Sequence, residues 1–159
     1  MKKGSTIFLK IVLCLMAVGA LAGMIRFPLT EGRAINLDLF SIYSDPFILF
    51  AYVASIPFFV ALYQAFKLLG HIGRNEVFSL SSVKTLSIIK YCAIILSILI
   101  VIAVVYIRIQ HNKDDDPAGF IAMGIFTTIT SIVIATAAAI FEKLLQRAVD
   151  IKSENDLTV

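Results

Sequence analysis

The chain has 159 residues, of which 59% are hydrophobic and 16% are charged. Soluble domains carry about a quarter charged residues, so this composition excludes an ordinary soluble enzyme or soluble nucleic-acid-binding domain. The net charge of +3 does not indicate a nucleic-acid surface. The charged residues flank the apolar stretches, where they act as topology signals.

Four apolar stretches follow one another along the chain, at residues 7–25, 46–66, 86–107 and 118–141. Each is long enough to cross a bilayer core of about 30 Å at about 1.5 Å per residue. The segments between them are too short to fold alone. We therefore predict one all-α domain over residues 1–159, an integral-membrane antiparallel four-helix bundle with short loops.

The distribution of Lys and Arg predicts the orientation of the spans. If the N-terminus lies inside, ten of the fourteen Lys and Arg fall on inner segments and four on outer segments. Short cytoplasmic segments of membrane proteins carry such an excess. We therefore predict that both termini are cytoplasmic and that the fourth helix extends into the cytoplasm within residues 142–159.

The start of the chain supports two interpretations. Met1-Lys2-Lys3, an apolar run and Ala20-Leu21-Ala22 together resemble a cleavable secretory signal. Lys10 interrupts the apolar run near its start, which favours a retained first span. Either interpretation leaves the orientation of the other three spans unchanged.

Small residues predict where helices pack closely, because lipid provides no hydrophobic drive for helix association. Gly19 and Gly23 form a G-x-x-x-G motif in the first span. The fourth span repeats a small residue at every fourth position: Thr127, Ser131, Ala135 and Ala139. We expect the first and fourth spans to be in close contact, and these faces also leave a homo-oligomer open.

The interiors of the spans contain little that could move an ion. No Asp, Glu, Arg or His lies deep within any of them, although ion-coupled transport normally requires such a group. Pro57 predicts a kink in the second span because it leaves the Val53 carbonyl without a donor, and Ser55 is placed to compensate. A small transporter subunit or channel with a mobile Pro57 is therefore the alternative to a binding protein.

We predict no catalytic residue, no cofactor and no metal site, and hence a protein that is not an enzyme. The sequence contains no H-E-x-x-H, C-x-x-C or phosphate-loop motif. Asp114, Asp115 and Asp116 could hold a hard cation. Adjacent residues of a loop rarely converge on one ion, however, and Asp116-Pro117 better fits the cap and first turn of the fourth helix.

Two inner segments provide a candidate binding surface. An apolar stripe continues along the fourth helix beyond its span, and it must be buried on the bundle, on lipid or on a partner helix. Packing on the bundle and partner binding remain equal alternatives. The candidate partner-binding residues come from this stripe and from the loop after the second span: Arg74, Glu76, Phe78, Lys84, Leu144, Leu145, Ala148 and Val149.

The inner loop and the C-terminus resemble a known bacterial family. Gly73-Arg74-Asn75-Glu76-Val77-Phe78-Ser79, with Val83-Lys84-Thr85-Leu86, is similar to a signature of the domain-of-unknown-function family numbered 2975. Ser153-Glu154-Asn155-Asp156-Leu157-Thr158-Val159 is similar to its C-terminal motif, whereas Arg74-Asn75 departs from the pattern. The resemblance implies a four-span protein of the bacterial plasma membrane. It also implies a partner, since family members are often encoded beside a small helix-turn-helix regulator.

These observations lead to one expectation about function. We expect an uncharacterised, non-enzymatic bacterial inner-membrane protein that binds a cytoplasmic protein, with a DNA-binding regulator as the partner implied by the resemblance. The chain itself is not expected to bind nucleic acid.

Overall fold

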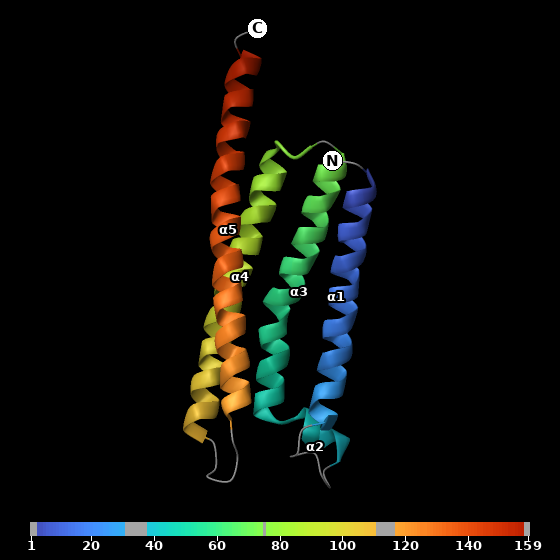
Figure 1. Ribbon diagram of the computed structural model, residues 1–159, viewed down its shortest axis with the longest axis vertical. Coiled ribbons are helices and arrows are strands. Elements are labelled where there is room, and N and C mark those ends of the chain that lie inside the picture. Colours follow the sequence, from blue (N-terminus) through green and yellow to red (C-terminus); the bar gives the residue numbers. More distant parts are fainter. Residues whose placement is uncertain (1–2, 31–37, 75, 111–116, 158–159) are drawn as a thin grey trace.

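A computed structural model of the chain describes residues 3–30, 38–74, 76–110 and 117–157. It contains four long helices, α1 (Lys3–Thr30), α3 (Pro46–Gly73), α4 (Leu80–Gln110) and α5 (Ala118–Leu157), and the short helix α2 (Leu39–Tyr43). All four long helices have the length and apolar composition needed to cross a membrane. The predicted all-α architecture of four antiparallel spans is confirmed (Figure 1).

Local chemistry sets the starts of α3 and α4. Asp45 caps α3, because its carboxylate accepts a hydrogen bond of 2.7 Å from the Phe47 amide while Pro46 occupies the first turn. Ser79 caps α4, where its hydroxyl accepts a hydrogen bond of 3.3 Å from the Ser82 amide. α5 begins at Ala118, as predicted, whereas Asp116 lies outside the described residues.

Both termini lie at the same end of the molecule, which we call the termini end (Figure 1). The helices run past the predicted spans there. α5 has 40 residues and is therefore about 60 Å long. It continues beyond the loop that joins α3 to α4, so its last turns project from the bundle (Figure 1).

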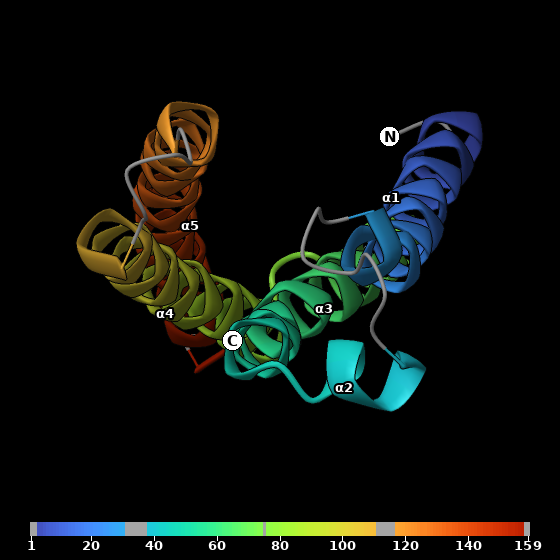
Figure 2. The ribbon, with the colours of Figure 1, turned by 90° about the horizontal axis from the view of Figure 1, so that it is seen from below.

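The long helices form one open, curved row in the order α1, α3, α4, α5 (Figure 2). Each helix packs on its neighbours in this row, and α1 and α5 occupy its two ends. The expectation that the first and fourth spans are in close contact is therefore wrong. A Cβ atom added at Gly19 or Gly23 would meet no atom within 4 Å. The G-x-x-x-G motif consequently packs on no other helix of the described chain.

Small residues instead bring α5 close to α4. On α5, Gly124, Ser131, Ala135 and Ala138 are buried at spacings that follow one helix face. A Cβ atom at Gly124 would overlap Val104 Cγ2 of α4. Of the four packing residues predicted in the fourth span, Ser131 and Ala135 thus lie in a helix contact. The helix that they contact is α4, not the first span as expected. Of the other two, Ala139 is half-buried and Thr127 is exposed, with its hydroxyl donating to the Met123 carbonyl.

Charged residues from all four long helices mark one level of the molecule. Lys90 of α4 pairs with Glu142 of α5 at 2.7 Å, and Lys10 of α1 lies 4.9 Å from the ring centroid of Phe66 in α3. Lys67 and Lys143 follow Phe66 and Glu142 directly. We call the charged residues the charged belt: Lys10, Lys67, Lys90, Glu142 and Lys143. The His71–Ser82 contact between α3 and α4 places Lys67 and Lys90 within about one helical turn of each other.

The charged belt separates two parts of the bundle. On one side all four helices are apolar, as a bilayer core requires. On the other side, toward the termini end, lie the buried polar side chains Thr6, Ser82 and Thr85, whereas Ser97 and Ser131 are buried on the apolar side. Lys and Arg at the ends of apolar runs are typical of a membrane boundary.

A proline in α1 creates the contact that joins α1 to α3. Pro28 lacks an amide hydrogen, so the Met24 carbonyl one turn earlier has no helical donor. The Tyr52 hydroxyl of α3 donates to this carbonyl at 3.1 Å. One side chain thus satisfies a backbone group that lipid could not satisfy.

Pro57 does not interrupt its helix. α3 continues through Pro57 as a single helix. The Ser55 hydroxyl donates to the Tyr52 carbonyl at 2.6 Å, rather than to the Val53 carbonyl that sequence analysis singled out.

Aromatic side chains pack together at the end of the molecule that lies opposite the termini end. The Phe47 ring lies 6.5 Å from that of Tyr106 on α4 and 5.7 Å from that of Phe120 on α5. Helix α2 docks beside α1, where the Tyr43 hydroxyl donates to the Ile25 carbonyl at 3.1 Å. One ring of α3 therefore contacts both α4 and α5 at this end.

The close approach at Gly124 predicts an unequal response to two matched substitutions. Gly124→Ala should lower the free energy of unfolding by about 1–3 kcal/mol, because the stiff Val104 side chain cannot move aside cheaply. Gly119→Ala, on the same helix with no atom within 4 Å of the added Cβ, should change it by less than about 0.5 kcal/mol. Unfolding of the purified protein in bicelles measures both values, and equal effects would contradict the packing described.

The Pro28–Tyr52 pair predicts non-additive effects. Tyr52→Phe should cost about 1–3 kcal/mol of stability, because it leaves the Met24 carbonyl unsatisfied. In a Pro28→Ala background the same substitution should cost much less, since α1 then supplies its own donor. A double-mutant cycle by the same unfolding assay tests this, and an additive result would rule out the coupling.

Candidate functional site

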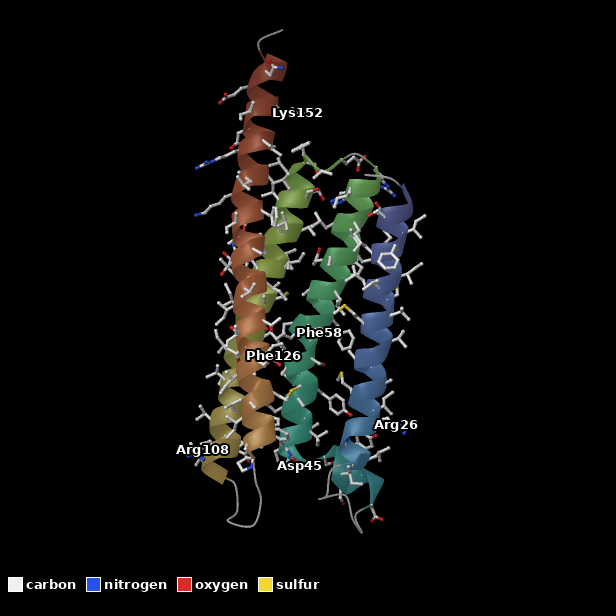
Figure 3. All side chains as sticks on the ribbon, viewed as in Figure 1. Arg26, Asp45, Phe58, Arg108, Phe126 and Lys152 are labelled. Atoms are coloured by element: carbon white, nitrogen blue, oxygen red, sulfur yellow. The ribbon has the colours of Figure 1, made fainter. Side chains whose placement is uncertain are left out.

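A concave feature that involves both inner segments lies at the termini end. It is an open groove of about 990 Å³ between the end of α5 and the segment that joins α3 to α4. We call it the terminal groove, and Lys152 on its α5 side is labelled in Figure 3. The groove is lined by Glu76, Phe78 and Ser79 from the joining segment and by Ala148, Ile151, Lys152, Glu154 and Asn155 from α5.

Apolar side chains in the terminal groove are exposed beyond the charged belt, toward the termini end. Phe78 is 58% exposed and Ile151 is 67% exposed. Each square ångström of apolar surface left in water forgoes about 25 cal/mol. Large apolar side chains held together in a groove are typical of surfaces that another molecule covers.

The groove brings together only some of the residues predicted to bind a partner. Glu76, Phe78 and Ala148 line it. Arg74, Lys84 and Leu144 are exposed but do not line it, and Val149 is half-buried. Leu145 is only 9% exposed, because it packs on α4.

The apolar stripe of α5 is therefore divided between two surfaces. Successive residues of a helix are rotated by about 100°, so the apolar residues that continue along α5 beyond its span cover more than one side of the helix. These residues are Phe141, Leu144, Leu145, Ala148, Val149 and Ile151. Leu145 faces α4, whereas Ala148 and Ile151 face the terminal groove. Packing on the bundle and exposure in a groove thus both occur on the same stripe.

Several lining residues were not among the predicted ones. Ile151 ends the apolar stripe, and this position was the signal that could have identified it. Glu154 and Asn155 belong to the C-terminal motif that resembles the family, but the sequence did not place them or Lys152 beside the joining segment, because that depends on how far α5 extends. Ser79 lines the groove and also caps α4.

A buried hydroxyl lies directly behind the wall of the groove that the joining segment forms. Ser82 of α4 is 0% exposed. Its Oγ donates to the Glu76 carbonyl at 3.2 Å and lies 3.1 Å from both His71 Nδ1 and Ser79 Oγ. Ser82 therefore connects the end of α3, the joining segment and the start of α4.

The lining of the groove combines apolar and charged side chains. Its floor is apolar, and its rim carries charges of both signs, Glu76, Lys152 and Glu154. No group of three potential metal ligands occurs among the residues that the structure describes. Asp114, Asp115 and Asp116 lie outside those residues. An apolar floor with a charged rim fits the apolar face of an amphipathic helix.

Comparison with known proteins identifies relatives of this chain. The model of a family described as protein of unknown function (DUF2975) matches residues 29–159. The chain is 44% identical, over the full length of both chains, to the uncharacterized membrane protein YoaS of Bacillus subtilis (strain 168). No solved structure matches. The family match includes every residue of the terminal groove. The match begins at residue 29, so it does not include α1 up to Pro28.

The division of the apolar stripe between two surfaces predicts unequal losses of stability when the same substitution is made at two positions of α5. Leu145→Lys should destabilise the fold by about 3–5 kcal/mol, because it buries an unpaired charge against α4. Ile151→Lys should change stability by less than about 0.5 kcal/mol, because the side chain is exposed. Thermal unfolding in detergent compares the two, and a stable Leu145→Lys variant would contradict the burial of Leu145.

Proposed function

We infer a function for this chain from the premise that it belongs to the DUF2975 family of proteins of unknown function. It is a bacterial-type membrane protein with four apolar helices. We propose that it is not an enzyme and that its terminal groove binds a helix of a cytoplasmic protein. One observation carries this proposal: Phe78 and Ile151 face a common groove, more than half exposed, beyond the charged belt.

The proposal requires the termini end to face the cytoplasm. The excess of Lys and Arg on the segments at this end supports that orientation. The charged belt supports it as well, because Lys67 and Lys143 lie where anionic headgroups of the inner leaflet attract cations. The protein would then span the plasma membrane of a bacterium, with the terminal groove open to cytoplasmic proteins.

The nature of the partner follows from the groove and from the family resemblance together. The two walls, one from the joining segment and one from α5, leave room for a helix of the partner, whose apolar residues would contact Phe78, Ala148 and Ile151. The resemblance supplies the class of partner, a small helix-turn-helix regulator. Binding at the membrane would restrain such a regulator from reaching DNA.

The geometry favours this function over a transporter subunit or channel. The four helices of one described chain form an open row and not a ring (Figure 2). Three of the charges near the spans are already engaged, Lys90 with Glu142 and Lys10 with the Phe66 ring. A conducting path would have to come from several copies.

Orientation is tested by cysteine labelling in a Cys14→Ala, Cys92→Ala background. A membrane-impermeant maleimide should label Asp38→Cys in intact cells and should label Ser153→Cys only after lysis. Both positions are exposed and lie at opposite ends of the described chain. Labelling of Ser153→Cys in intact cells would place the terminal groove outside the cell and refute the proposed partner class.

Partner binding is tested by crosslinking and pull-down from native membranes with a tag at the N-terminus. A small DNA-binding protein should be recovered, and Ile151→Lys should reduce its recovery by about tenfold or more, as loss of a central apolar anchor does. Leu144→Lys is the matched control, because Leu144 is an exposed apolar residue of the same helix, also beyond the predicted span, that does not line the groove. Recovery of the chain alone, or equal recovery with all variants, would contradict the proposal.

A further inference from the structure

The hydrogen bonds around Ser82 can be assigned from the number of donors that each group has. A serine hydroxyl donates one hydrogen and accepts through two lone pairs. The Glu76 carbonyl only accepts, so the Ser82 hydrogen points to it across 3.2 Å. Both remaining contacts of Ser82 Oγ, to His71 Nδ1 and to Ser79 Oγ, must then be bonds that it accepts.

This assignment leaves every partner satisfied. Ser79 Oγ donates to Ser82 Oγ and accepts from the Ser82 amide at 3.3 Å. His71 must carry a proton on Nδ1, which leaves Nε2 as the bare nitrogen when the imidazole is neutral. The opposite tautomer would make Ser82 donate to His71 and would leave the Glu76 carbonyl without this donor.

We propose that Ser82 is the positioning residue of the terminal groove: it holds the wall that carries Glu76, Phe78 and Ser79 by donating to the Glu76 carbonyl and accepting from His71 and Ser79. The significance of this assignment for binding rests on the proposed function, but the assignment itself does not. Ser82 is 0% exposed, so no water can replace these bonds without a rearrangement. Phe78 stands between two residues held by Ser82 and therefore keeps its place opposite Ile151.

The chain offers a matched control on the same helix. Thr85 is 1% exposed, and its hydroxyl donates only within α4, to the Ser81 carbonyl at 2.9 Å. Thr85→Val therefore removes a buried hydroxyl one turn from Ser82 without removing any bond to the joining segment. Ser82→Ala removes a hydroxyl of the same kind together with all three of its bonds.

Two measurements on the full chain in lipid nanodiscs test the proposal. Amide hydrogen exchange at residues 76–79 should become faster in Ser82→Ala and remain unchanged in Thr85→Val. Nitrogen-15 NMR of histidine-labelled protein, in a His111→Gln background at about pH 8, should show His71 protonated on Nδ1. That preference should be lost in Ser82→Ala and retained in Thr85→Val.

The outcomes separate this proposal from the proposed function. Protonation of neutral His71 on Nε2 in the otherwise unchanged protein would overturn it. So would unchanged exchange at residues 76–79 in Ser82→Ala. Neither measurement needs a partner, so failure to capture a cytoplasmic protein would count against the proposed function and leave the role of Ser82 intact.

Discussion

Lipid removes the hydrophobic drive that holds helices together in water, and the arrangement of this chain depends on what replaces it. Between α4 and α5 the replacement is close backbone approach through Gly124, Ser131 and Ala135, with one ion pair, Lys90–Glu142, near its end. A charged pair inside an otherwise small and apolar contact favours one register of the two helices over its neighbours. The register of α4 against α5 also determines how the two walls of the terminal groove face each other, because one wall comes from the segment leading into α4 and the other from the end of α5.

The elements of the fold could be predicted from sequence because their causes are local. Apolar length predicted the four spans, and the second apolar stretch, which begins at residue 46, starts where α3 starts. The arrangement of the helices could not be predicted in the same way. A small-residue motif indicates that another helix can approach closely, but it does not indicate which helix does so. Gly19 and Gly23 accordingly face open space, while Ser131 and Ala135 meet α4 and not α1.

The site was predictable in part, for a related reason. Glu76, Phe78 and Ala148 were identified because they lie on an inner loop and an apolar stripe, both of which are visible in the sequence. The different fates of Leu145 and Ile151 were not visible. They depend on which side of α5 the neighbouring helix covers, and periodicity alone does not contain that information. The same holds for Tyr52, whose bond to the Met24 carbonyl joins residues 28 positions apart.

The open row has a consequence for how the protein is made. Every extensive contact between long helices joins helices that are consecutive in the chain: α1 with α3, α3 with α4, and α4 with α5. Chains dominated by contacts between sequence neighbours assemble without waiting for distant segments, and synthesis presents these helices in the same order. Each helix can therefore dock as it leaves the ribosome, with no earlier contact to break. Since α5 arrives last and supplies one wall of the terminal groove, a chain still being translated displays no finished groove to a partner.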